Sequence, residues 1–261
     1  MNGDYCHSCG QRLIKKRFST KSILVDLGSS ITNVEAGFSR SFLDYLLRPG
    51  VMIHKYLNGA TRYYMKPFRY TFIWATIATI VMIYSGVYDL QQESVADFMN
   101  SSGVDGISDP DELQNSINLK VQEYSKKFMS FLMLVAIPFN SFGSWIVYKR
   151  STFKYQNELV KYHYADHLII NTYITGTVAA IGILATVFYA ICPQYVIWGT
   201  VSGLLIGQIF TFYVFLKVFK KNWFKTILKT ILAFLLALIL AVILLGGLSI
   251  VGGIIWAIFN H

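Results

Sequence analysis

Long apolar runs and short polar connections alternate along most of the chain. Five of the runs are long enough to cross the roughly 30 Å hydrocarbon core of a bilayer as helices. They lie at residues 68–88, 128–148, 168–192, 195–216 and 231–259. The pattern predicts an all-α fold, a polytopic membrane helix bundle of about five transmembrane helices within residues 68–259. The last run is long for one crossing, so it either tilts or breaks at a Gly-Gly pair, 246–247 or 252–253.

The region before the first span has a different period. Between residues 22 and 47, apolar side chains recur every three or four positions, which is typical of an amphipathic helix. Pro49 and Gly50 end this pattern, and Asn58-Gly59 marks a second stop. Residues 12–67 are therefore expected to form amphipathic helices at the cytosolic membrane surface, because Lys and Arg residues flank them on both sides.

Composition and charge fit a membrane protein and exclude other classes. The chain has 261 residues, of which 54% are hydrophobic and 14% charged. This is too apolar for an ordinary soluble domain, and it excludes a disordered chain. The formal net charge of +9 is spread over the connections between the spans instead of forming one basic domain. No nucleic-acid partner is expected, and the predicted partner is the lipid bilayer.

The signs of the charges predict the orientation. Residues 1–69 carry 11 Lys and Arg residues, and the connections 149–161 and 217–229 carry 4 and 5. Residues 89–127 instead contain eight acidic residues against three lysines. Under the positive-inside rule the basic segments are cytosolic and 89–127 is an external acidic loop. This places the N-terminus inside and the C-terminus outside.

A metal site is one interpretation of the cysteines and histidines. Residues 1–11 form a zinc-knuckle-like tail, in which Cys6 and Cys9 would close two thiolates onto one ion. His163 and His167 are four apart and would share a face of a helix, with Asp166 beside them. Together the two cysteines and two histidines would complete a tetrahedral zinc site. The alternative is a metal-free tail, with Asp166 capping the third span.

Small residues in the last two spans predict close helix packing or self-association. They are spaced so that they share a helix face, which allows two backbones to approach in lipid. These residues are Gly203, Gly207, Ala233, Ala237 and Ala241. Pro138 and Gln208 lie within spans and would line a polar path if the protein were a transporter.

Several short motifs add a resemblance to these inferences. They are Cys6 to Gln11, Arg48-Pro49-Gly50, Tyr56-Leu57-Asn58-Gly59 and Asp166-His167. They resemble the motifs of a family of bacterial membrane proteins without an assigned function, in which a Cys-x-x-Cys-Gly knuckle precedes Arg-Pro-Gly and Tyr-Leu-x-Gly elements. The family pattern has Glu where this chain has Asp166. The resemblance implies a bacterial cytoplasmic (inner) membrane location and no particular reaction.

The charge pattern places these motifs on the cytosolic side, near the start of the third span. A functional face is therefore expected there. Its predicted residues are Arg48, Pro49, Gly50, His54, Tyr56, Asn58, Gly59, Arg62 and Asp166.

Three functions remain open from the sequence. No hydrolase triad or phosphate loop is present, which favours a non-enzymatic binding or assembly subunit that contacts another membrane protein or a second copy. A transporter or lipid-handling protein is the first alternative. A metal-dependent membrane enzyme that uses His163, Asp166 and His167 is the second.

Overall fold

A computed structural model of the chain describes residues 17–22, 37–61, 63–101, 120 and 122–259. The knuckle-like tail, much of the amphipathic region and residues 102–119 lie outside them. The described helices and strands are α2 (Phe38–Leu47), α3 (Pro49–Leu57), α4 (Pro67–Tyr84), α5 (Val87–Ser101), α7 (Met129–Tyr148), β1 (Thr152–Tyr155), β2 (Glu158–Lys161), α8 (Tyr164–Ile191), the short 3-10 helix η1 (Pro193–Tyr195), α9 (Ile197–Phe219) and α10 (Trp223–Phe259).

The predicted all-α membrane fold is confirmed. Five helices are long and apolar enough to cross a membrane, namely α4, α7, α8, α9 and α10 over Trp223–Leu244. Pro49 and Pro67 stand in the first turns of α3 and α4, where a missing backbone N–H costs no hydrogen bond. Asn58 is the C-cap of α3, and Gly59 follows with φ of +101°, so the predicted stop is present.

Two helix boundaries differ from the expected ones. The third span begins at Tyr164, four residues before the apolar run, because His163 and Asp166 cap the helix. Gly86, with φ of +72°, turns the chain after α4, and α5 follows at once. The first part of the segment expected as an acidic loop is therefore helical.

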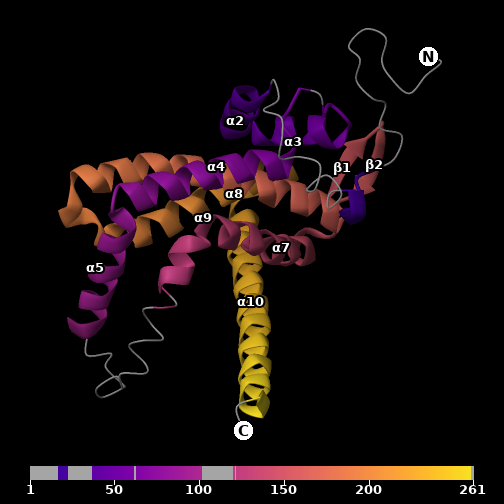
Figure 1. Cartoon of the computed structure of the whole chain (residues 1–261). Helices are drawn as coiled ribbons and strands as arrows, with labels where there is room; N and C mark the ends of the chain where they lie inside the picture. Colours follow the sequence, from indigo (N-terminus) through magenta and orange to yellow (C-terminus); the bar gives the residue numbers. More distant parts are fainter. Residues whose placement is uncertain (1–16, 23–36, 62, 102–119, 121, 260–261) are drawn as a thin grey trace.

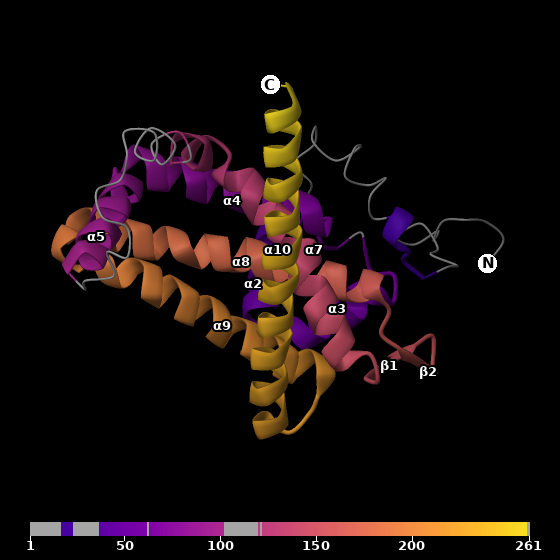
Figure 2. The same ribbon diagram turned by 90° about the horizontal axis from the view of Figure 1, so that it is seen from below.

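The spans are not all parallel. Helices α4, α8 and α9 run side by side as a layer, with α2 and α3 lying over it at one end (Figures 1 and 2). Helix α10 packs against α7 and α9 at its start, then crosses the layer steeply and leaves it. It is a single helix of 37 residues that continues through both Gly-Gly pairs, so the expected alternative of a break is not observed.

One end of the bundle holds the main core, and we call it the basic end. There the last residues of α7 and α9 meet the segment before α8, since the Tyr148 ring stacks 4.1 Å from Phe219 and the Tyr162 ring meets it edge-on. Three buried tyrosines, Tyr45, Tyr70 and Tyr173, pack together nearby. Their large rings join α2, α4 and α8 into one apolar cluster.

A β-hairpin that the sequence analysis missed projects from the basic end. Strands β1 and β2 pair antiparallel with Thr152 opposite Lys161 and Tyr155 opposite Glu158. The two turn residues, Gln156 and Asn157, both have positive φ, 47° and 70°. This is the twist that a two-residue hairpin turn requires.

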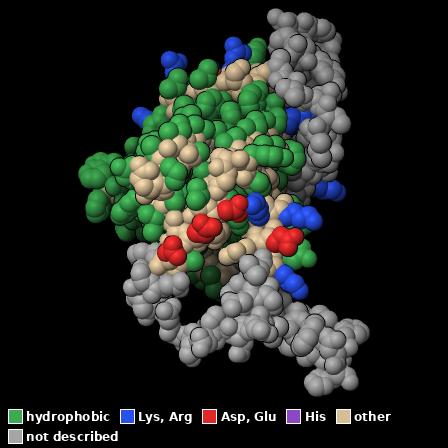
Figure 3. All heavy atoms as spheres, turned by 60° about the vertical axis from the view of Figure 1, so that its left-hand side comes forward, with side chains coloured by type: hydrophobic (Ala, Val, Ile, Leu, Met, Phe, Trp, Pro, Cys, Tyr) green, Lys and Arg blue, Asp and Glu red, His purple; other side chains and the backbone are tan. Residues whose placement is uncertain are grey.

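The opposite end, which we call the far end, consists of α5, the end of α8, η1 and the start of α9. Its described buried cluster is small and contains Val87, Tyr189 and Val196. Lys126 forms an ion pair with Asp89 on the surface, at 2.8 Å. A broad hydrophobic surface ends at a band of acidic and basic side chains where α5 lies (Figure 3).

Candidate functional site

His54 stands at the centre of the basic end. Its Nε2 lies 2.8 Å from the Tyr162 hydroxyl, which donates to the Val218 carbonyl at 3.4 Å. The imidazole also stacks on Phe153, with ring centres 5.9 Å apart. His54 thereby ties α3 to the hairpin and to α9.

The surroundings of His54 keep it uncharged at neutral pH. Burial lowers the pKa of the imidazole below its usual 6.5, and the neighbouring charge of Lys220 lowers it further. Burial also raises the pKa of the Tyr162 phenol, and the negative charge of Asp166 adds to that rise. The two groups thus stay neutral and hold a fixed hydrogen bond.

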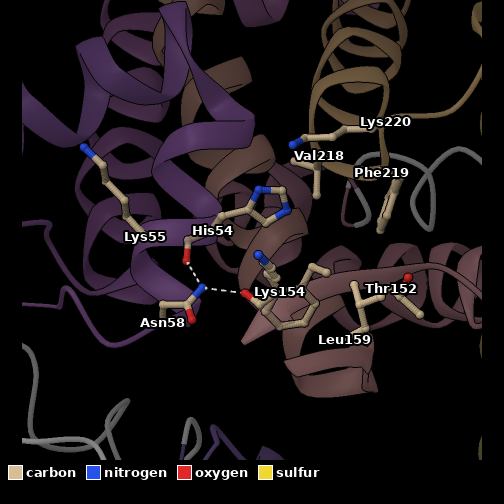
Figure 4. Close-up of a pocket in the computed structure, with 10 residues that line it drawn as sticks. His54, Lys55, Asn58, Thr152, Lys154, Leu159, Val218, Phe219 and Lys220 are labelled. Atoms are coloured by element: carbon tan, nitrogen blue, oxygen red, sulfur yellow. Dashed lines mark hydrogen bonds between the residues drawn. The ribbon is translucent and has the colours of Figure 1, made fainter. Parts of the chain in front are cut away.

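A pocket of about 530 Å³ opens beside His54, and we call it the hairpin groove. Its lining comes from α3, the hairpin and the end of α9: His54, Lys55, Asn58, Thr152, Phe153, Lys154, Leu159, Val218, Phe219 and Lys220. Three of these residues are lysines, and none is acidic. The volume is in the range of ordinary ligand sites. Figure 4 shows Lys154 and Lys220 close to the imidazole, with Lys55 pointing away from it.

Asn58 fixes the hairpin against α3. Its Nδ2 donates to the carbonyls of His54 and Lys154, at 2.8 and 3.0 Å, as the dashed lines in Figure 4 mark. Its Oδ1 accepts from the backbone N–H of Gln156 at 3.1 Å. One side chain therefore positions the hairpin turn and one wall of the hairpin groove.

A second pocket of about 400 Å³ adjoins the first, and we call it the interface groove. It lies between α3 and the end of α9 and is lined by Leu47, Arg48, Gly50, Val51, His54, Leu216, Lys217 and Lys220. The close approach of the two helices depends on Gly50, since a Cβ atom there would lie 2.3 Å from the Lys217 carbonyl oxygen. His54 and Lys220 belong to both grooves.

Arg17 joins the N-terminal region to the start of α8. Its guanidinium contacts the Asp166 carboxylate at 2.5 Å and donates to the Lys161 carbonyl at 3.1 Å. It also lies over the rings of Phe153 and Tyr155, 5.3 and 5.7 Å from their centres. The Asp166 side chain is only 2% exposed, so Arg17 supplies the charge that a buried carboxylate needs.

Asp166 also caps α8. Its carboxylate accepts from the backbone N–H of His163 at 2.8 Å, and the His163 side chain accepts from the backbone N–H of Asp166. This is a reciprocal capping box built with a histidine. The capping role that was the alternative to a metal site is therefore present.

His167 is a core residue. It is fully buried, its Nδ1 lies 3.0 Å from the Ser144 hydroxyl, and its ring stacks on Phe219. Asn171 donates to the same Ser144 hydroxyl at 2.9 Å. The Nε2 atom of His167 is buried and has no hydrogen-bond partner among the described residues.

The structure separates the two histidines of the predicted zinc site. His163 is the extended N-cap residue and faces Arg17, with 3.5 Å between its Nε2 and the guanidinium, whereas His167 faces Ser144. Cys6 and Cys9 lie outside the described residues. Within the described part of the chain, no group of three or more His, Cys, Asp or Glu residues could hold a metal ion. The shared zinc site stays a prediction.

A small polar cavity of about 90 Å³ lies between α7, α8, α9 and α10. Its polar lining residues are Asn140, Ser144, Asn171, Thr175, Gln208, Thr211 and Thr230. None of the residues that line it is charged. Space of this size holds about three water molecules. Pro138 lies inside α7, whose helix continues past it.

Most residues of the predicted functional face meet at the basic end. Arg48, Gly50, His54 and Asn58 line the two grooves, and Asp166 lies beside them under Arg17. The others have structural positions or are not described. Pro49 starts α3, Tyr56 is buried and stacks on Phe18, Gly59 ends α3, and Arg62 lies outside the described residues.

The predicted packing residues divide into two groups. Ala233 and Ala237 of α10 are buried against Gly143 of α7, where a Cβ atom would lie 2.2 Å from the Ala233 carbonyl oxygen. Ala241 is half-buried one turn further on. Gly203 faces open space, and Gly207 has only an ordinary contact with Val178 at 3.6 Å. The glycine pair of α9 therefore makes no close helix contact with the described residues.

Sequence reasoning missed the residues that the hairpin and α9 bring to the site. The sequence analysis assigns Lys154 and Lys220 only to basic connections and gives Tyr162 no role in the site. The alternation of Thr152, Phe153, Lys154 and Tyr155 was the available signal for a strand. No local signal connects Arg17 with Asp166, which is 149 residues away.

Fold and site together define a polytopic membrane protein with two grooves lined by basic residues at one end of its bundle. One family, described as "Protein of unknown function (DUF3667)", matches residues 35–79. The matched residues include α2, α3 and most of α4, and with them His54 and Asn58. No curated protein and no solved structure matches the chain.

Proposed function

We propose that the protein is a non-enzymatic binding or assembly subunit, which holds an acidic segment of another membrane protein in the hairpin groove. The observation that supports this most directly is the charge of the groove. Lys55, Lys154 and Lys220 line it without any carboxylate, around a His54 that stays neutral. A basic pocket of this kind favours anionic partners and excludes cationic ones.

Two further features support binding over catalysis. His54 and Tyr162 are hydrogen-bonded to each other and to the backbone, with pKa values moved away from neutrality, so neither is poised for proton transfer at pH 7. The hairpin also presents Leu159, which is 75% exposed, at the rim of the groove. An exposed apolar side chain beside lysines suits an amphipathic protein segment.

The proposal includes the orientation of the protein in the membrane. The basic end faces the cytosol, with the N-terminus inside and the C-terminus outside, as the positive-inside rule requires for its Lys and Arg residues. A cysteine at Ser102 should then react with an impermeant reagent in intact cells. If a cysteine at Ser19 is labelled instead, the protein has the opposite orientation to the one proposed.

The transporter alternative has weaker support. Its path would pass near Gln208, which lines the polar cavity, and near Pro138 within α7. That cavity has room for about three water molecules and holds no charged side chain, so it is too small for a lipid and poorly suited to an ion.

A photo-crosslinking amino acid at Leu159 tests the binding proposal in the full chain in its own membrane. We expect one discrete cross-linked protein, whose cross-linked peptide is acidic. Its yield should fall severalfold when Lys154→Glu reverses one charge of the groove, since an acidic segment is then repelled.

Two matched controls make this test specific. The crosslinker at Ile191, which is 74% exposed at the far end of α8, should not capture the same protein. Lys149→Glu makes the same change of charge outside both grooves and should leave the yield unchanged. Cross-linking that is insensitive to Lys154→Glu, or a partner peptide without acidic residues, would contradict the proposal.

A further inference from the structure

The interface groove has two chemically different walls. Leu47 and Val51 of the α2–α3 region are 66% and 52% exposed there, and Leu216 lies opposite them on α9. Arg48, Lys217 and Lys220 supply three positive charges, and none of the lining residues is acidic. A ligand that fits both walls carries an anionic group and an aliphatic part.

The position of the groove in the bundle matches the level of lipid headgroups. It lies at the C-terminal end of the membrane-spanning helix α9, where the apolar run gives way to lysines. Tyr213, one turn before Lys217, donates from its hydroxyl to the Leu47 carbonyl at 2.9 Å, and the Lys217 ammonium lies 5.9 Å from its ring centre. Tyrosine and lysine at the end of a span are typical of the boundary between hydrocarbon and headgroups.

The aliphatic wall continues towards the membrane interior. Leu205 and Ile209 of α9 are 57% and 65% exposed, and their spacing from Leu216 places them on the same face of the helix. A track of exposed aliphatic side chains thus runs from the cations along the span. A soluble phosphate would use the cations alone, whereas a lipid would use the whole track.

The backbone fixes the spacing of two of these cations. Helix α3 begins at Pro49, directly after Arg48. The nine-residue helix is held there by the contact of Gly50 with the Lys217 carbonyl. Arg48 and Lys217 therefore stand on two different elements whose separation is fixed.

We propose that the interface groove binds an anionic glycerophospholipid. Arg48, Lys217 and Lys220 hold its phosphate, and one acyl chain lies over Leu47, Val51 and Leu216. This goes beyond the proposed binding of a protein segment, which takes place in the neighbouring hairpin groove. A bound lipid would fill the interface groove and contact both the amphipathic helix α3 and the end of the spanning helix α9.

Native mass spectrometry of the full chain tests the proposal. The protein is released from bilayers that contain equal amounts of phosphatidylglycerol and phosphatidylcholine, and the retained lipids are counted. We expect preferential retention of phosphatidylglycerol. Each basic residue contributes about 1 kcal/mol to binding an anionic lipid surface, so the Arg48→Gln, Lys217→Gln double variant should lose roughly 30-fold in this preference.

Controls separate charge, folding and the source of the phosphate. Lys149→Gln with Arg150→Gln removes two exposed charges outside the groove and should retain the preference. Arg48→Lys with Lys217→Arg keeps both charges and should retain most of it, which excludes a folding defect as the cause. Inorganic phosphate at millimolar concentration should not displace the lipid, since it lacks the aliphatic part.

Three results would overturn the proposal: equal retention of the two lipids by the unchanged protein, an unchanged preference in the double glutamine variant, or displacement of the lipid by inorganic phosphate. The changed residues Arg48 and Lys217 line only the interface groove, and Lys154 and Leu159 line only the hairpin groove, while the shared Lys220 is changed in neither test. The lipid and the protein-binding proposals can therefore fail separately.

Discussion

At the basic end, the rings of Tyr45, Tyr70 and Tyr173 lie 5.3 Å from their neighbours, and hydrogen bonds link them to backbone and side-chain atoms of other elements. At the far end, the described buried cluster contains only Val87, Tyr189 and Val196. The same long helices supply both ends. Within the described residues, the basic end is thus joined by one large buried cluster, whereas the far end has a much smaller one.

The hairpin contributes to this contrast. Phe153 and Tyr162 pack under it, outside the membrane-spanning helices, and belong to the large buried cluster. Burial there is driven by the hydrophobic effect, which does not operate between helices in hydrocarbon. The two grooves lie beside this cluster, which supports the backbone of the elements that carry their lysines.

The largest expected difference between the two ends concerns their ion pairs. Arg17→Ala should destabilise the protein by about 3 kcal/mol, because it leaves the buried Asp166 carboxylate without its counter-charge. Lys126→Ala at the far end should cost at most about 1 kcal/mol, since that pair is exposed. Thermal unfolding in detergent micelles measures both variants. Equal shifts in Tm would remove the distinction between the two ends.

An intermediate effect is expected from two glycines. Gly143→Ala places a methyl group against the Ala233 backbone, and overpacking of this kind costs about 1–3 kcal/mol. Gly203→Ala meets open space and should stabilise α9 by up to about 1 kcal/mol through helix propensity. Tm again provides the measurement, and a destabilised Gly203→Ala variant would indicate that α9 packs on a neighbour through this face.

The smallest effect concerns pH. The pKa of His54 is lower in the folded protein than in the unfolded chain, so the unfolded chain binds more protons as the pH falls below about 6.5. The contribution of His54 to stability is therefore complete at pH 7 and is lost on acidification. Tm should fall between pH 7 and 5, and the fall should be smaller in His54→Gln. An identical pH dependence in both proteins would show that His54 does not titrate on unfolding.

The sequence predicted the parts of the fold that depend on local chemistry. Apolar runs longer than a bilayer core revealed the five spans, and Pro49 and Asn58-Gly59 marked the limits of α3. These signals are local because a helix satisfies its own hydrogen bonds. The start of α8 at Tyr164 was missed because a polar capping box, and not an apolar residue, begins it.

The site was predicted only in part, for a physical reason. The motifs around Arg48 and His54 pointed to the end of the bundle where the two grooves lie, but the grooves also contain Lys154 from the hairpin and Lys220 from the end of α9. Which distant residues meet is decided by packing, such as the contact of Gly50 with Lys217. The hairpin lacked a strong turn signal, since Gln156-Asn157 is not the Asn-Gly pair that usually marks such turns.

The contact between Gly50 and Lys217 also sets an order of events during biosynthesis. The chain emerges from its N-terminus, so α3 is made long before the segment of α9 on which it rests. Until that segment has been inserted, α3 lacks its contact with α9, and only the packing of α2 and α3 on α4 and α8 can form. The amphipathic pattern of α2 and α3 suits them to the bilayer surface in the meantime. Assembly of the basic end is thus delayed until the fourth crossing is complete, and Arg17 can reach Asp166 only after the third has begun.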